Sequence, residues 1–190
     1  MAKAEYRSAI RSRQMIKAAL ADLLQEKPLD KITVTDVVNR AQINRGTFYA
    51  HYADIPDVIQ HLIQEAFSSI QEALAQPHPL ADVPQVLLNQ VQSFLEKDLD
   101  FYRKVLSSSV SALMQEQLVE TVLEYLLQHE ADYPIGNHEQ YVFLIRFCAG
   151  GLSNLYREWF AGKLPLSLDE LTQRASALLS TVISESLIDR

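Results

Sequence analysis

The sequence predicts an all-α protein of about nine helices, in which a three-helix N-terminal headpiece is joined to a larger helical body. Apolar residues recur at spacings of three and four along most of the chain, which is the period of amphipathic helices. Five glycines and seven prolines among 190 residues are too few for an extensively disordered chain. No stretch shows the alternation of apolar and polar residues that is typical of a half-buried strand.

The first two helices have clear start and stop signals. The first is expected at 6–26, and it ends at Lys27 because the residue before a proline is pushed out of the α region. Thr33 can cap the second helix, and the acid Asp36 stands at the third helical position, as in a capping box. We expect this helix to run to about Ala41.

Two more helices follow after a short break. Asn44 is a good N-cap for a third helix that reaches about Tyr52. Asp54 caps a long fourth helix, whose first turn tolerates a proline and which is broken at 77–79. The rest of the chain contains five predicted helices, at 83–97, 101–106, 111–129, 137–161 and 167–187, and a predicted loop at 130–136.

Charge is unevenly distributed along the chain. Residues 1–53 hold nine Lys and Arg against five Asp and Glu, a net charge of +4, whereas residues 54–190 carry −11. The overall charge of −7 argues against a nucleic-acid partner, but a basic head on an acidic body allows phosphate attraction at one end. A terminal segment that is basic by chance is the alternative. We expect one domain at 6–66 and a second at 67–190.

The break at 42–43 separates two short helices, which is typical of a helix-turn-helix whose second helix enters the major groove of DNA. Ala41, Ile43 and Phe48 are apolar where these two helices must pack together. Arginine can bind guanine with two hydrogen bonds, hydroxyl groups can bind phosphates or base edges, and glycine lets the backbone approach closely. Hydroxyls at a helix N-terminus lie where free N–H groups attract phosphate. The candidate DNA contacts are Thr33, Thr35, Arg45, Gly46, Thr47, Tyr49 and His51.

A solvated helix face is the competing interpretation of these polar residues, and the motif around them favours DNA contact. For the cations of the first helix, phosphate contact and simple solvation both stay open. These cations are Arg7, Arg11, Arg13 and Lys17.

The stretch from Ile32 to Tyr52 resembles the TetR family of bacterial transcriptional regulators, most specifically in its Gly46-Thr-Phe-Tyr-x-His-Tyr52 core. The resemblance covers 6–66 well, and the segment around 150–159 resembles a C-terminal type that is common in the family. It implies base contacts for Arg45, Gly46 and Tyr49, and phosphate contacts for Thr35, Thr47 and His51. Two positions depart from the family pattern. Gln42 replaces the usual turn glycine, which predicts modest strain in a left-handed conformation, and Ile55 replaces a lysine that often contacts phosphate.

The resemblance also implies that the body binds a small-molecule effector and that the protein binds double-stranded operator DNA as a homodimer through its last two helices. Repression is the commoner mode in the family, and activation is the alternative. The candidate effector pocket consists of Phe101, Tyr102, Tyr125, Phe143, Arg146 and Phe147. Aromatic residues at helical spacing are equally typical of plain core, and solvation at the surface is the alternative for Arg146.

Other classes of function find little support in the sequence. The five histidines show no metal-ligand spacing, no glycine loop suits phosphate, and Cys148 lies on an apolar helix where nothing lowers its pKa. We therefore expect no enzyme activity, cofactor or metal. A single cysteine suits the cytoplasm, and no apolar run suits a signal peptide or a bilayer span. A helical interaction adaptor would explain the acidic body but not the basic head.

Overall fold

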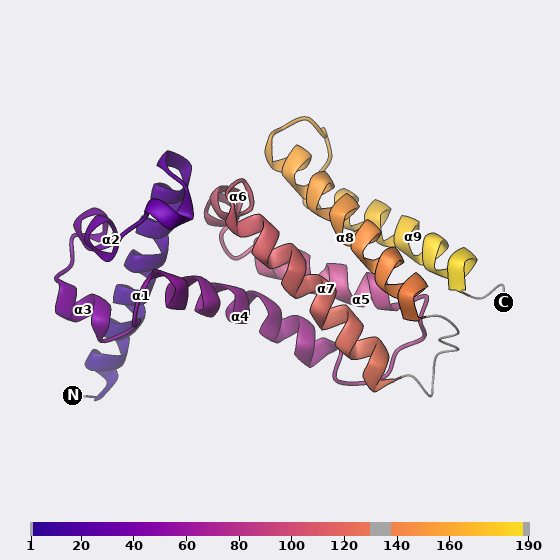
Figure 1. The fold of residues 1–190 in the computed structure, drawn as a ribbon, viewed down its shortest axis with the longest axis horizontal. Helices are drawn as coiled ribbons and strands as arrows, with labels where there is room; N and C mark the ends of the chain where they lie inside the picture. The colour runs from indigo at the N-terminus through magenta and orange to yellow at the C-terminus, as the bar shows by residue number, and fades with distance from the viewer. Residues whose placement is uncertain (1, 130–137, 188–190) are drawn as a thin grey trace. The chain divides into compact units, whose positions relative to one another are not determined.

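The computed structural model describes residues 2–129 and 138–187, and within these residues it contains nine α-helices, one short 3₁₀ helix (Leu29–Lys31) and no strand. The prediction of an all-α fold with about nine helices is confirmed for this part of the chain. The predicted loop at 130–136 lies outside it. The helices are α1 (Ala2–Glu26), α2 (Val34–Ala41), α3 (Arg45–Tyr49), α4 (Ile55–Ala73), α5 (Val83–Leu95), α6 (Leu99–Leu106), α7 (Val110–Gln128), α8 (His138–Phe160) and α9 (Leu168–Leu187) (Figure 1).

The contacts divide the chain into two compact units. The headpiece comprises residues 2–65 and 100–111, and the body comprises 66–99 and the described residues of 112–187. Most of α6 thus groups with the headpiece, although it lies beyond the sequence boundary expected at residue 66. Polar contacts explain this grouping, because Lys104 forms an ion pair of 2.9 Å with Asp22 and its carbonyl accepts a hydrogen bond of 2.8 Å from the Gln25 amide.

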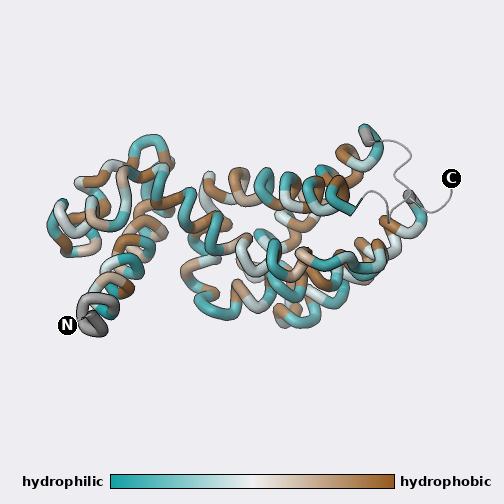
Figure 2. The backbone as a smooth tube through the Cα atoms, turned by 90° about the horizontal axis from the view of Figure 1, so that it is seen from below, coloured by the Kyte–Doolittle hydropathy of each residue, from teal (hydrophilic) through white to brown (hydrophobic). Residues whose placement is uncertain are grey.

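The apolar stripes of the first four helices form the core of the headpiece. Helix α1 packs against α2, and α2 packs against α3. Apolar and polar residues alternate along the tube of each helix at the helical period, as expected of amphipathic helices with one buried face (Figure 2). The core side chains that are fully or almost fully buried include Ile16, Leu20, Val37, Val38, Phe48, Val58 and Leu62.

The helix caps predicted for the headpiece are present. The Thr33 hydroxyl accepts a hydrogen bond of 3.2 Å from the Asp36 N–H, and the Asp36 carboxylate accepts one of 2.8 Å from the Thr33 N–H. The Asn44 side-chain oxygen accepts from the Thr47 N–H at 2.7 Å. Helix α3 ends at Tyr49, three residues before the predicted end, because the chain closes there into a turn.

Gln42 adopts the left-handed conformation that its place in the turn predicts, with φ 53° and ψ 42°. A side chain with a Cβ atom is strained in this region by about 1–2 kcal/mol. We expect Gln42→Gly to raise the free energy of unfolding of the headpiece by about 1 kcal/mol, since the gain is partly offset by the entropy of glycine in the unfolded chain. Urea denaturation followed by circular dichroism measures this change. Gln42→Ala keeps the Cβ atom and serves as the control, so an equal gain in both variants would contradict the explanation by strain.

In the body, α5 packs against α9. Two serine hydroxyls of α9 hold this pair together: Ser176 donates to the side-chain oxygen of Gln85 and Ser180 donates to the carbonyl of Ala81, both at 2.7 Å. Helix α8 ends at Phe160, and Gly162, two residues later, has a positive φ of 72°, as is typical of the residue that follows a helix. None of the helices in the described part of the chain combines the length and apolar character that crossing a membrane requires.

Candidate nucleic-acid interface

Phe48 fixes the orientation of α3. Its side chain is 0% exposed, and its ring lies 5.6 Å from that of Tyr49 in a T-shaped arrangement and 6.1 Å from that of Tyr52. A helix of five residues cannot bury a broad face, so this single aromatic anchor determines which side of α3 faces solvent. Tyr49, the next residue, is consequently 56% exposed.

The exposed side of α3 gathers several of the predicted DNA contacts. Arg45, Gly46 and Tyr49 are exposed, whereas Thr47 is half-buried and donates its hydroxyl proton to the Asn44 side chain at 3.0 Å. The guanidinium of Arg45 donates to the Thr35 hydroxyl at 2.8 Å. The structure therefore places Arg45 beside the N-terminal turn of α2, where a phosphate would be attracted by free N–H groups.

The position of Gly46 beside the cap of α3 gives a structural reason for a glycine here. A Cβ atom at this position would lie 3.2 Å from the side-chain oxygen of Asn44, which is the cap of α3. Any larger residue would thus press against the group that starts the recognition helix.

Thr33 is engaged in the cap of α2. Its hydroxyl donates to the Asp36 carboxylate at 2.7 Å, and Lys27 forms an ion pair of 2.7 Å with the same carboxylate. The ion pair with Lys27 and the hydrogen bonds from Thr33 hold the pKa of Asp36 well below its usual value. A phosphate at this helix end would therefore meet a carboxylate whose charge Lys27 balances, and contact through Thr33 stays a prediction.

The depressed pKa of Asp36 makes the stability of the headpiece depend on pH. A carboxyl group whose pKa is lower in the folded than in the unfolded state stabilises the fold above its unfolded value, and this contribution is lost as the pH falls. We expect the free energy of unfolding to decrease as the pH falls below about 5, and the decrease should be smaller in Asp36→Asn. Urea denaturation between pH 3 and pH 7 measures it. Asp30→Asn removes an exposed carboxylate nearby and should retain the full decrease, so identical profiles for the two variants would contradict this role of Asp36.

The cations of the headpiece fall into two groups. Six of those in the described residues form ion pairs, namely Lys17 with Glu65, Lys27 with Asp36, Lys31 with Asp30, Arg40 with Glu26, Arg103 with Asp100 and Lys104 with Asp22. Three exposed arginines of α1 form none with a described residue, and these are Arg7, Arg11 and Arg13. The uncompensated positive charge therefore lies on α1 and at Arg45, and these residues are the better candidates for phosphate contact.

His51 is half-buried and lies near Arg13. Burial, aided by the positive charge of Arg13, lowers the pKa of the His51 imidazole below its usual value of 6.5. In the protein without DNA, this lowered pKa favours the neutral form of the ring.

The structure does not bring the six candidate effector residues together. Phe101 and Tyr102 lie on α6 in the headpiece unit, and the buried Tyr125 accepts a hydrogen bond through its hydroxyl in the body. On α8, Phe143 is 74% and Phe147 69% exposed. Arg146 forms two hydrogen bonds of 2.9 Å with the Glu116 carboxylate of α7 at the surface. None of the six lines the cavity that the body contains.

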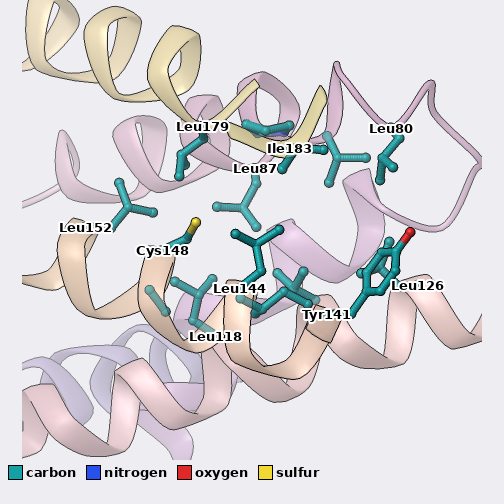
Figure 3. A pocket seen from close by; sticks show the side chains of 15 residues that line it. Leu80, Leu87, Leu118, Leu126, Tyr141, Leu144, Cys148, Leu152, Leu179 and Ile183 are labelled. Carbon is teal, nitrogen blue, oxygen red and sulfur yellow. The ribbon is translucent and has the colours of Figure 1, made fainter. Parts of the chain in front are cut away.

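That cavity, which we call the body cavity, lies among α5, α7, α8 and α9 and has a volume of about 80 Å³ (Figure 3). Its walls are mainly leucine, valine and isoleucine side chains, together with the Tyr141 ring, the Cys148 thiol and the small side chain of Ala149. Sequence reasoning missed it because aliphatic residues at helical spacing are typical of any core. No pattern along the chain reveals where four helices leave a gap.

Residues 16–62 match the family described as bacterial regulatory proteins, tetR family. Over 69 residues the chain is 35% identical to YxbF, an uncharacterized HTH-type transcriptional regulator of Bacillus subtilis strain 168, and the match covers 36% of this chain. The chain spans 18% of the length of YxbF.

Two solved structures show the same fold. DhaS, described as a dihydroxyacetone kinase operon activator, has a TM-score of 0.57 and 20% identity over 92% of this chain and 97% of its own. FadR from Bacillus halodurans, described as a fatty acid degradation regulator, has a TM-score of 0.64 and 17% identity over 89% and 94% of the two chains. At these identities the likeness concerns the fold alone. Over residues 16–62, the N-terminal helix-turn-helix of this chain is therefore similar to that of the tetR family of bacterial regulatory proteins.

Proposed function

We propose that this protein is a transcriptional repressor that binds operator DNA as a homodimer and is released by a small-molecule effector. The observation that carries the proposal is the solvent-facing side of α3, where Arg45 and the exposed ring of Tyr49 stand above the buried Phe48. A helix held in this way presents few but well-oriented groups to base edges, which is what direct readout in the major groove requires. We infer a cytoplasmic location, because operator DNA lies in the cytoplasm and because a single cysteine suits a reducing compartment.

The proposed contacts divide into positioning and reading. Arg45, Gly46 and Tyr49 would meet base edges, while the arginines of α1 and the N-terminus of α2 would hold phosphates. Contacts to phosphate fix the register of a protein on DNA but carry no sequence information, so the specificity would come from α3. Thr35, Thr47 and His51 are proposed as further phosphate contacts.

Dimerisation is proposed through α8 and α9. Phe143 and Phe147 are one helical turn apart and both strongly exposed, and Leu178 of α9 is exposed as well. Large apolar side chains grouped on a surface mark sites of protein association. A second copy of this chain would bury them and would present two recognition helices to half-sites about 34–36 Å apart.

Selection of bound fragments from a random duplex library tests this proposal. We expect the enriched DNA to contain two inverted half-sites, and we expect sedimentation to show a dimer. The double variant Phe143→Asp/Phe147→Asp should sediment as a monomer, whereas Leu127→Asp, which changes an exposed leucine of α7, should remain dimeric. Enrichment of single half-sites, or a wild-type monomer at micromolar concentration, would refute the homodimer.

Activation is the second candidate, and the shared fold with a protein described as an operon activator favours it. A reporter gene placed downstream of the selected operator distinguishes the two modes. Repression predicts that the protein lowers expression of the reporter, and activation predicts that it raises expression.

A further inference from the structure

We propose that the body cavity binds a small uncharged ligand with a flexible alkyl chain, and that it excludes the corresponding carboxylates. This ligand would be the effector of the proposed function, so the proposal rests on that function and specifies what kind of molecule the body can hold. The chemistry of the walls, the size of the space and the position of one thiol carry the inference.

The walls offer no charge to a ligand. Among the described residues that line the cavity, the only polar side-chain groups are the Tyr141 hydroxyl and the Cys148 thiol. A carboxylate or phosphate that entered would give up its water shell without a cation to pair with, which strongly opposes binding. An alkyl chain would instead exchange water for contacts with the aliphatic walls.

The size of the cavity favours a narrow ligand. Its volume of about 80 Å³ is about half that of an engineered apolar cavity of roughly 150 Å³ that stays dry and binds benzene. A rigid ring system would therefore have to displace the walls. A linear chain can pass between the side chains of Leu87, Leu144 and Leu179, which come from three different helices (Figure 3).

Cys148 provides a readout inside the cavity. It is the only cysteine among the 190 residues, and its sulfur points toward Leu87 and Leu179 across the space (Figure 3). Burial raises the pKa of the Cys148 thiol, so the group is neutral and reacts slowly. A bound chain would cover the sulfur and slow its alkylation further, and mass spectrometry of the intact protein assigns the product to one site.

The test compares 1-butanol with butanoate, which have the same chain length, are narrower than benzene and differ in charge. We expect 1-butanol at ten times its dissociation constant to slow alkylation of Cys148 by iodoacetamide about tenfold, because only the empty fraction reacts. Butanoate at the same concentration should slow it less than about twofold. Equal protection by both compounds, or protection by neither, would overturn the proposal.

Two variants sharpen the result. Ala149→Leu adds three carbon atoms to the wall and should abolish protection by 1-butanol while leaving DNA affinity unchanged. Ile183→Lys introduces an ammonium group at a half-buried position of the wall and should shift the preference toward butanoate. If Ala149→Leu does not fold, the comparison of the wild type with Ile183→Lys still tests the proposal. If Ile183→Lys prefers the alcohol over the carboxylate as strongly as the wild type does, the argument that charge excludes carboxylates is wrong.

The same measurements separate this proposal from the proposed function. Protection of Cys148 requires no DNA. If the protein binds DNA but 1-butanol does not protect Cys148, only the proposed class of ligand is wrong. If 1-butanol protects selectively but the protein binds no DNA, only the proposed regulatory function is wrong.

Discussion

Phe48→Ala is expected to unfold the recognition helix and to lower the free energy of unfolding of the headpiece by about 3–5 kcal/mol. Phe48 is fully buried, and α3, the helix that carries it, contacts both α1 and α2. Removing a buried ring costs both the transfer of its carbons from water and the cavity that remains. Since small domains are stable by only about 5–15 kcal/mol, this loss is a large part of the total.

Urea denaturation followed by circular dichroism measures the effect of Phe48→Ala. Tyr49→Ala is the matched control, because it removes the neighbouring ring from the exposed side of the same helix. We expect the control to lose about 1 kcal/mol or less, the share of one aromatic contact. Equal losses in the two variants would contradict the assignment of Phe48 as the anchor.

The second large effect is on DNA binding. We expect Arg45→Ala and Tyr49→Ala each to weaken binding to the selected operator at least about tenfold, since a good contact to a base edge contributes about 1–3 kcal/mol. Both side chains are exposed, so folding should change little. Arg40→Ala removes the same charge from an arginine that two hydrogen bonds of 2.8 Å tie to Glu26, and it should weaken binding much less. Equal losses for Arg45→Ala and Arg40→Ala would show that charge alone matters and that α3 does not read the sequence.

The features of the headpiece that the sequence predicts are local ones. The capping box of Thr33 and Asp36 and the cap at Asn44 join residues three positions apart, so the residue types at that spacing suffice to predict them. The left-handed conformation of Gln42 agrees with what the family resemblance implies, because Gln42 replaces the usual turn glycine. Ile55, which departs from the family pattern, is buried, so the position serves the core of the headpiece in this chain.

The features that escaped prediction depend on contacts between distant segments. Arg40 and Lys104 are neutralised by acids 14 and 82 residues away, and no pattern along the chain identifies such partners. The net charge of the first 53 residues therefore does not show where the unpaired positive charge lies, and its location on α1 and at Arg45 emerged only from the structure. The aromatic residues predicted to form a pocket do not lie together in the structure, and this too depends on contacts between distant segments. Phe143 and Phe147 face solvent, whereas aliphatic side chains line the body cavity.

The central claim is that a protein with a net charge of −7 binds DNA through a small uncompensated basic surface. Measuring the affinity of the wild type for its selected operator at several salt concentrations tests this claim most directly. A protein that neutralises several phosphates shows a linear fall of the logarithm of its binding constant with the logarithm of salt concentration, with a slope of about −0.9 for each phosphate. We predict a steep slope that becomes shallower by about one for each phosphate-binding arginine of α1 replaced by alanine. Binding that is absent at low salt, or that does not change with salt, would contradict the account.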